Sequence, residues 1–158
     1  MISQFCNWLD ATPLSQTFQS LVWFVPGVQT VHILSIGVVM TSVGILAGKL
    51  VGMTGRSQTL SAMVSSIMPW VWWALAVLLA TGLLLTVTEP SRELLNAAFR
   101  AKMLMVLAMA GILRLVQARL RQDPDYWGRR RAAAGSLGAA SLLLAVSIIV
   151  AGRWIAYI

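Results

Sequence analysis

The sequence has few of the residues that most enzymes and metalloproteins use for chemistry. It contains one cysteine, one histidine and five acidic residues among 158 positions. A single cysteine excludes an internal disulfide, and the chain has no cysteine–histidine cluster for zinc or an iron–sulfur centre. A glycine-rich phosphate loop and a serine–histidine–aspartate set are also missing. These absences exclude several large classes of soluble catalysts.

Apolar sequence is what the chain has in abundance. Hydrophobic residues make up 58% of it, and the mean hydropathy is +0.79. Four apolar runs, at about 21–47, 61–87, 97–116 and 132–158, each reach the roughly 20 residues that a helix needs to cross a bilayer. A segment in lipid must satisfy its own backbone, so each run is predicted to be a helix. The predicted fold is all-α, a four-transmembrane-helix bundle forming a single membrane domain over 1–158.

The N-terminal segment, 1–20, is predicted to be an amphipathic interfacial helix instead of a span. Phe5 and Leu9 recur at helical spacing, which favours a helix lying on the membrane surface. Thr12 followed by Pro13 is typical of a helix N-cap and its first helical position. This segment is therefore expected to lie on the outer membrane surface before the chain turns into the bilayer.

Small residues and one proline give expectations about helix packing. Gly37 and Gly44 in the first run, and Gly135 and Gly138 in the fourth, are predicted to let a neighbouring helix approach closely. Pro69 interrupts the second run, so it is predicted either to kink that helix or to end a short first segment.

The net charge of +7 is distributed in a way that argues for a topology and against nucleic-acid binding. Eight of the twelve basic residues flank the segments 48–60 and 117–131, and Lys and Arg concentrate on cytoplasmic loops. Both termini are therefore predicted to lie outside the cytoplasm, on the periplasmic side of a bacterial inner membrane. The basic loops are predicted to meet anionic lipid headgroups of the bilayer. These eight residues are Lys49, Arg56, Arg114, Arg119, Arg121, Arg129, Arg130 and Arg131.

Ionisable residues inside a membrane are costly, so each one is a candidate functional residue. His32 lies in the first run, Arg100 and Lys102 in the third, and Arg153 in the fourth. With the predicted topology all four fall in the outer leaflet. One imidazole and up to three cations suit a flat apolar ligand with acidic substituents. Haem b, with His32 as an axial ligand of the metal and the cations beside its propionates, fits that description, and a quinone-like cofactor is an alternative.

A structural role for the same residues is the competing interpretation. Long basic side chains near helix ends extend to the headgroups, and His32 can instead hydrogen-bond across helices or to Thr30 or Ser35. The chain would then be a non-catalytic anchor or scaffold subunit of a larger complex. Because there is one histidine, a bis-histidine haem site would need a homo-oligomer, a second subunit or another ligand. The first interpretation predicts a small subunit that supports electron transfer with a partner.

Two short stretches carry a family resemblance. The Trp-Phe-Val-Pro sequence at 23–26, followed by His32, and the Phe-Arg-Ala-Lys sequence at 99–102 resemble an uncharacterised family of bacterial four-helix integral membrane proteins. More distantly they resemble CopD-type copper-resistance proteins and HemJ-type protoporphyrinogen oxidases. In the HemJ type, a histidine on an early helix and a lysine on a later one form the functional pair, and haem b is bound. The resemblance implies that His32 and Lys102 take those roles.

Overall fold

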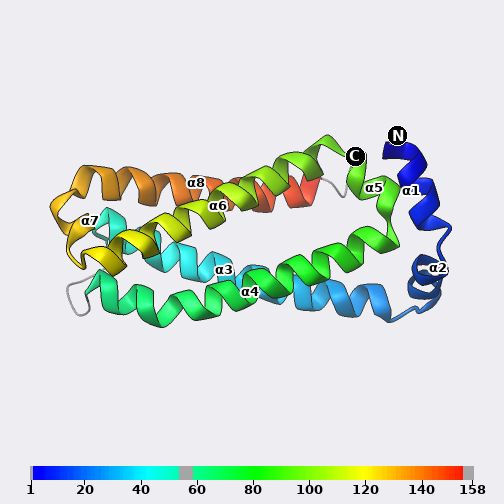
Figure 1. Cartoon of the computed structure of the whole chain (residues 1–158), viewed down its shortest axis with the longest axis horizontal. Helices are drawn as coiled ribbons and strands as arrows, with labels where there is room; N and C mark the ends of the chain where they lie inside the picture. Colours follow the sequence, from blue (N-terminus) through cyan, green and yellow to red (C-terminus); the bar gives the residue numbers. More distant parts are fainter. Residues whose placement is uncertain (1, 54–58, 155–158) are drawn as a thin grey trace.

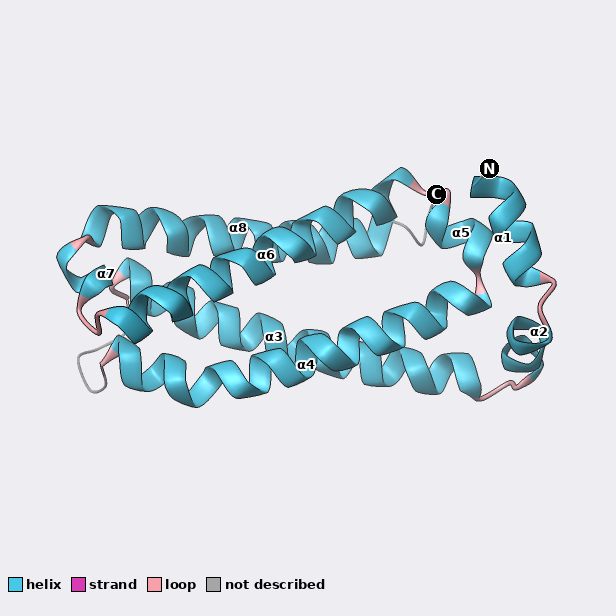
Figure 2. Ribbon diagram, in the orientation of Figure 1, coloured by secondary structure: helices cyan, strands magenta, loops and turns pink. Residues whose placement is uncertain are grey.

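The structure is a computed structural model that describes residues 2–53 and 59–154. Every regular element in these ranges is a helix, and four long helices run along one another with short helices at both ends (Figures 1 and 2). The helices are α1 (Ile2–Asp10), α2 (Pro13–Ser20), α3 (Phe24–Val51), α4 (Leu60–Thr88), α5 (Pro90–Leu94), α6 (Ala97–Gln122), α7 (Tyr126–Arg129) and α8 (Arg131–Trp154). The all-α prediction, with a short helix before the four long ones, is confirmed.

Four helices within the described residues are long and apolar enough to cross a membrane. They are α3, α4 and α6, with 28, 29 and 26 residues, and the 23 residues Arg131–Arg153 of α8. Their apolar surfaces would be unstable in water, and their backbones are satisfied within each helix. The chain is therefore a multi-pass membrane protein whose helices face a lipid bilayer.

The helices differ from the predicted membrane spans mainly at their ends, where they extend beyond the apolar runs. The run at 21–47 corresponds to α3, which starts and ends later, and the run at 97–116 corresponds to α6, which continues to Gln122. Hydropathy marks the part of a helix that lies in lipid, and both helices extend beyond that part. Pro69 lies inside a continuous α4, so the alternative that a short first segment ends there is wrong. The predicted fourth run reaches residues 155–158, which lie outside the described residues.

Helix α3 ends at a residue that must adopt a left-handed conformation. Gly52 has a φ of 86°, which a residue without a Cβ adopts at little cost. The Gly52 N–H donates to the Lys49 carbonyl, and the Met53 N–H donates to the Gly48 carbonyl at 2.9 Å. These bonds satisfy carbonyls that have no partner within the helix, so the chain can turn sharply here.

The buried hydrophobic core lies mainly in the half of the bundle near α7 and extends along α8 to Ile148. Its residues fall within 39–50 of α3, 64–74 of α4, 109–120 of α6 and 134–148 of α8, and Trp127 of α7 completes it. Figure 1 shows α4 and α6 running apart toward the end at which α5 connects them. Helices α4 and α6 therefore diverge toward that end, while α3 stays beside α4 and α6 stays beside α8.

One of the four predicted close-packing glycines makes a tight contact. A Cβ at Gly138 would lie 2.9 Å from the Ala47 carbonyl oxygen, whereas a Cβ at Gly37, Gly44 or Gly135 would meet nothing within 4 Å. The close approach is therefore between α8 and α3 at Gly138. Gly37, Gly44 and Gly135 make no such close approach within the chain, and their use between protomers stays a prediction.

The two ends of the bundle differ in charge. Helix α7 and the α3–α4 connection lie at one end, and α1, α2, α5 and the last described turn of α8 lie at the other (Figure 1). Lys49 and the arginines at 119, 121 and 129–131 belong to the α7 end. Arg56, a further predicted member of this basic set, lies outside the described residues.

Candidate functional site

The end of the bundle opposite α7 is held together by the N-terminal helices. Thr12 accepts a hydrogen bond from the Ser15 N–H and caps α2 as predicted. The Ser15 hydroxyl donates to the Val87 carbonyl at 2.8 Å, and the Gln19 side-chain amide donates to the Thr88 carbonyl at 2.9 Å. Both carbonyls belong to the last turn of α4, where helical partners are missing. Helix α2 therefore caps α4 and fixes the position of this end.

His32 lies on α3 in the less tightly packed half and bonds to α4. Its Nδ1 atom is 2.7 Å from the Thr81 hydroxyl oxygen. The Thr81 hydroxyl oxygen is also 2.7 Å from the Val77 carbonyl oxygen, a distance that fits donation to that carbonyl. A hydroxyl has one hydrogen to donate, so when Thr81 donates to Val77 it accepts from His32. The proton of the neutral imidazole is then on Nδ1, which leaves the lone pair on Nε2.

Thr81 was not among the partners that the sequence suggested. The Thr30 and Ser35 hydroxyls donate to the Pro26 and Val31 carbonyls of their own helix, at 2.8 and 2.9 Å. Such bonds to the preceding turn are common for hydroxyl side chains inside helices. His32 instead bonds across helices, which was the other structural possibility.

The surroundings of the His32 ring leave it accessible. A Cβ at Gly82 would lie 3.6 Å from the His32 Cε1 atom, so the absence of a side chain there leaves room beside the ring edge. Within the described residues, the Nε2 atom makes no hydrogen bond, and the ring as a whole is half-buried. The imidazole is therefore fixed through one nitrogen and free to bind through the other.

Lys102 is the one predicted cation that the structure brings into range of His32. It is half-buried on α6, and its ammonium lies close to α8, because a Cβ at Gly152 would be 3.8 Å from Nζ. The ammonium interacts electrostatically with His32 and with Glu93. Lys102 thus places a positive charge opposite the α3–α4 pair that holds the imidazole.

The other two predicted cations take peripheral positions. Arg100 and Arg153 are exposed, although both belong to the end of the bundle that holds His32. Arg153 follows Gly152, the residue beside the Lys102 ammonium. The structure therefore places Lys102 within electrostatic range of His32 and leaves the two arginines exposed at the same end of the bundle.

Glu93 is a member of this region that the sequence analysis did not select. It lies on the short helix α5 and is half-buried. Burial raises the pKa of the Glu93 carboxyl above its usual value, while Lys102 and Arg92 act in the opposite direction. Its signal in the sequence was weak, because a carboxylate between two spans is normally a solvated loop residue.

The interior of this half is apolar but incompletely buried. In the described outer parts of α3, α4 and α6, at 24–38, 75–88 and 97–108, the fully buried residues are Ser35, Thr81 and Thr88. All three are hydroxyl residues, in contrast to the aliphatic core near α7. The imidazole and the ammonium therefore lie where α3, α4 and α6 bury no aliphatic side chain fully, while α8 still contributes the buried Ala145 and Ile148.

A bare metal ion has too few protein ligands at this site. Among the described residues, no group of three or more His, Cys, Asp or Glu side chains is placed to hold a metal. A zinc or similar ion bound by protein needs three or four such ligands. Haem iron is different, because the porphyrin supplies four nitrogens and the protein needs to add one axial ligand.

Residues 11–158 match a protein family that is described as "Family of unknown function (DUF6644)". The match includes all four long helices and both His32 and Lys102. No curated protein and no solved structure matches the chain.

Proposed function

We propose that this chain, which belongs to the DUF6644 family of unknown function, is a small membrane subunit that binds haem b through His32. The observation that carries the proposal is the hydrogen bond from His32 Nδ1 to Thr81, at 2.7 Å. Histidines that bind metals usually donate their second ring N–H to a nearby oxygen, which fixes the ring and its tautomer. With its Nδ1 proton directed to Thr81, His32 would have that arrangement, and Nε2 would be the ligand atom.

The surrounding residues suit the rest of a haem. Lys102 would place its ammonium beside a propionate, and Arg100 and Arg153 at the rim would do the same where the propionates reach the membrane surface. The half-buried His32 on an apolar helix suits the edge of a flat porphyrin, whose faces would contact the apolar residues of these helices. When bound, haem iron supplies one-electron redox chemistry. The residues of the chain hold, orient and neutralise the cofactor.

A single histidine sets a limit on the ligation. The chain has one histidine, so it provides one histidine ligand to the iron. We propose that a second copy or another subunit provides any further histidine and exchanges electrons with the site. In this proposal the chain lies in a bacterial inner membrane, with the His32 end and both termini on the periplasmic side, because the basic residues gather at the opposite end. The resemblance to HemJ-type proteins supports the same pair of residues.

Absorbance spectroscopy of the protein purified from membranes with its native partners tests the proposal. We expect a Soret band and reducible α and β bands for the wild type, and their loss in His32→Ala. Lys102→Gln should keep the bands but release haem more readily, because it removes one charge contact and keeps the iron ligand. A wild type without haem bands contradicts the proposal. Bound quinone in the lipid extract would then favour the quinone-like cofactor, and no cofactor would favour an anchor subunit.

A substitution next to His32 separates ligation from packing. Thr81→Val removes the hydroxyl that holds Nδ1 and keeps the side-chain shape, so haem affinity should fall by about 10- to 100-fold. Thr86→Val is the matched control, because the Thr86 hydroxyl donates to the Gly82 carbonyl of its own helix at 2.8 Å and contacts no ring. Equal haem affinity in the two variants would contradict the orienting role of Thr81.

A further inference from the structure

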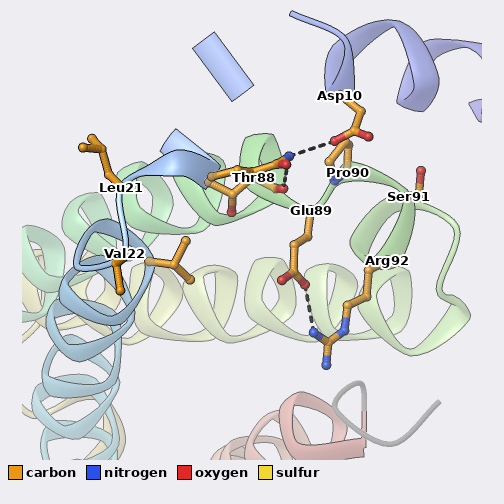
Figure 3. A pocket seen from close by; sticks show the side chains of 10 residues that line it. Asp10, Leu21, Val22, Thr88, Glu89, Pro90, Ser91 and Arg92 are labelled. Atoms are coloured by element: carbon orange, nitrogen blue, oxygen red, sulfur yellow. Dashed lines mark hydrogen bonds and ion pairs between the residues drawn. The ribbon is translucent and has the colours of Figure 1, made fainter. Parts of the chain in front are cut away.

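A pocket at the same end of the molecule lies apart from His32 and combines charges with an apolar wall. It has a volume of about 660 Å³ and is bounded by α1 and α2, the start of α3 and the corner between α4 and α5. That volume is typical of a site for a small molecule or a lipid headgroup. Figure 3 shows Asp10 on one side, Leu21 and Val22 on another, and the Glu89–Arg92 pair on a third.

The charges in the pocket are separated and nearly balanced. Asp10 accepts a hydrogen bond from Gln19 at 2.9 Å, which leaves most of the acceptor capacity of its carboxylate unused. On the opposite side, Arg92 pairs with Glu89 at 2.8 Å, and both side chains are about half exposed. Such an exposed pair is weak and exchanges readily with another ion. A ligand with one positive and one negative group would match this pattern.

Asp10 also lies where a negative charge is unfavourable without a partner. It is the last residue of α1, and the C-terminal end of a helix carries partial negative charge. A cation bound at Asp10 would offset both the charge of the carboxylate and the partial negative charge of the helix end. The Gln19 amide does not provide that charge, because it is neutral.

The position of the pocket indicates a lipid as the source of such a ligand. Leu21 and Val22 are 51% and 80% exposed, and Trp23 beside them is 86% exposed. Apolar residues with an exposed tryptophan at the end of a span are typical of the membrane–water interface. Acyl chains would run along these residues while the headgroup lies between Asp10 and Arg92.

We propose that this pocket binds the headgroup of a zwitterionic phospholipid with a primary amine, of the phosphatidylethanolamine class. The ammonium would donate to Asp10, and the phosphate would accept from Arg92. A quaternary choline group has no N–H to donate and is usually held by aromatic rings, and none of the pocket residues is aromatic. Anionic lipids are disfavoured because the pocket has two carboxylates and one guanidinium. The proposal is independent of haem.

Native mass spectrometry of the full chain with lipids of identical acyl chains tests the site. We expect phosphatidylethanolamine to be retained about tenfold better than phosphatidylcholine or phosphatidylglycerol, the factor expected for one charge-assisted hydrogen bond. Asp10→Asn should remove the preference over phosphatidylcholine, and Arg92→Gln should weaken retention of both zwitterionic lipids. Asp125→Asn and Arg121→Gln, at the α7 end, are the controls and should leave the preference for phosphatidylethanolamine over phosphatidylcholine unchanged.

A lipid series gives the same test without mutation. Successive N-methylation of phosphatidylethanolamine removes one donor at a time, so retention by the wild type should fall stepwise. Equal retention of all methylated forms, or preferred retention of phosphatidylglycerol, would overturn the proposal. An Asp10→Asn variant that remains folded and still prefers phosphatidylethanolamine over phosphatidylcholine would also overturn it.

Discussion

Replacement of Gly138 by alanine measures how closely α8 and α3 approach. The new Cβ would lie 2.9 Å from the Ala47 carbonyl oxygen, 3.0 Å from Val51 Cγ2 and 3.1 Å from Leu50 Cβ. The first contact is with backbone, so it cannot be relieved by rotating a side chain. Overfilling a packed interface costs about 1–3 kcal/mol. The same substitution raises helix propensity by about 1 kcal/mol, so the net effect of Gly138→Ala is a loss of up to about 2 kcal/mol.

Gly135→Ala on the same helix isolates the contact. It gains the same helix propensity, but its Cβ would meet nothing within 4 Å. The difference between the two variants should therefore equal the overfilling cost, about 1–3 kcal/mol. Thermal unfolding in detergent should give the order Gly135→Ala, wild type, Gly138→Ala, from most to least stable. Equal stability of the two alanine variants would refute the close approach of α8 to α3.

Three further substitutions test the end of the bundle opposite α7 and the C-terminal end of α3. Ser15→Ala removes the donor to the Val87 carbonyl and should destabilise the protein by about 1 kcal/mol in thermal unfolding; an unchanged midpoint would contradict the capping of α4 by α2. Gly52→Ala forces a Cβ into a conformation with φ of 86° and should cost about 1 kcal/mol in the same assay. Burial raises the pKa of Glu93, so the folded state binds this proton more tightly than the unfolded state does. That contribution to stability is full below the ordinary pKa of 4.5 and is lost as the pH rises through the raised value. Glu93→Gln should abolish this part of the pH dependence, and an unchanged profile would contradict the burial of Glu93.

The helices were predictable because their signal is local. A run of more than 20 apolar residues must form a helix in lipid, whatever its neighbours are. The end of such a helix is less predictable, because Lys49 continues α3 beyond the apolar run without breaking the helix. The N-cap at Thr12 was also predictable, since it depends on two adjacent residues.

The sequence predicted members of the candidate site but not their contacts. Ionisable residues in apolar runs are visible in a sequence, so His32 and Lys102 were both selected. Thr81 is 49 residues away from His32, and no local pattern specifies that pairing. Glu93 was missed because its half-buried state depends on how α5 lies against the bundle. Close contacts at glycines within the chain are equally hard to predict, because only the packed structure determines which face of a helix meets a neighbour.

Chemical rescue tests the central claim, that His32 Nε2 is the axial ligand of a haem, most directly. In His32→Ala the haem bands should be lost, and added imidazole should enter the space of the ring and restore them, with the wild-type positions of the reduced bands. Thr81→Val combined with His32→Ala should respond more weakly to imidazole, because the hydroxyl that orients the ring is absent. If wild-type protein contains haem and His32→Ala retains the same spectrum before imidazole is added, the iron is held elsewhere and the claim is wrong.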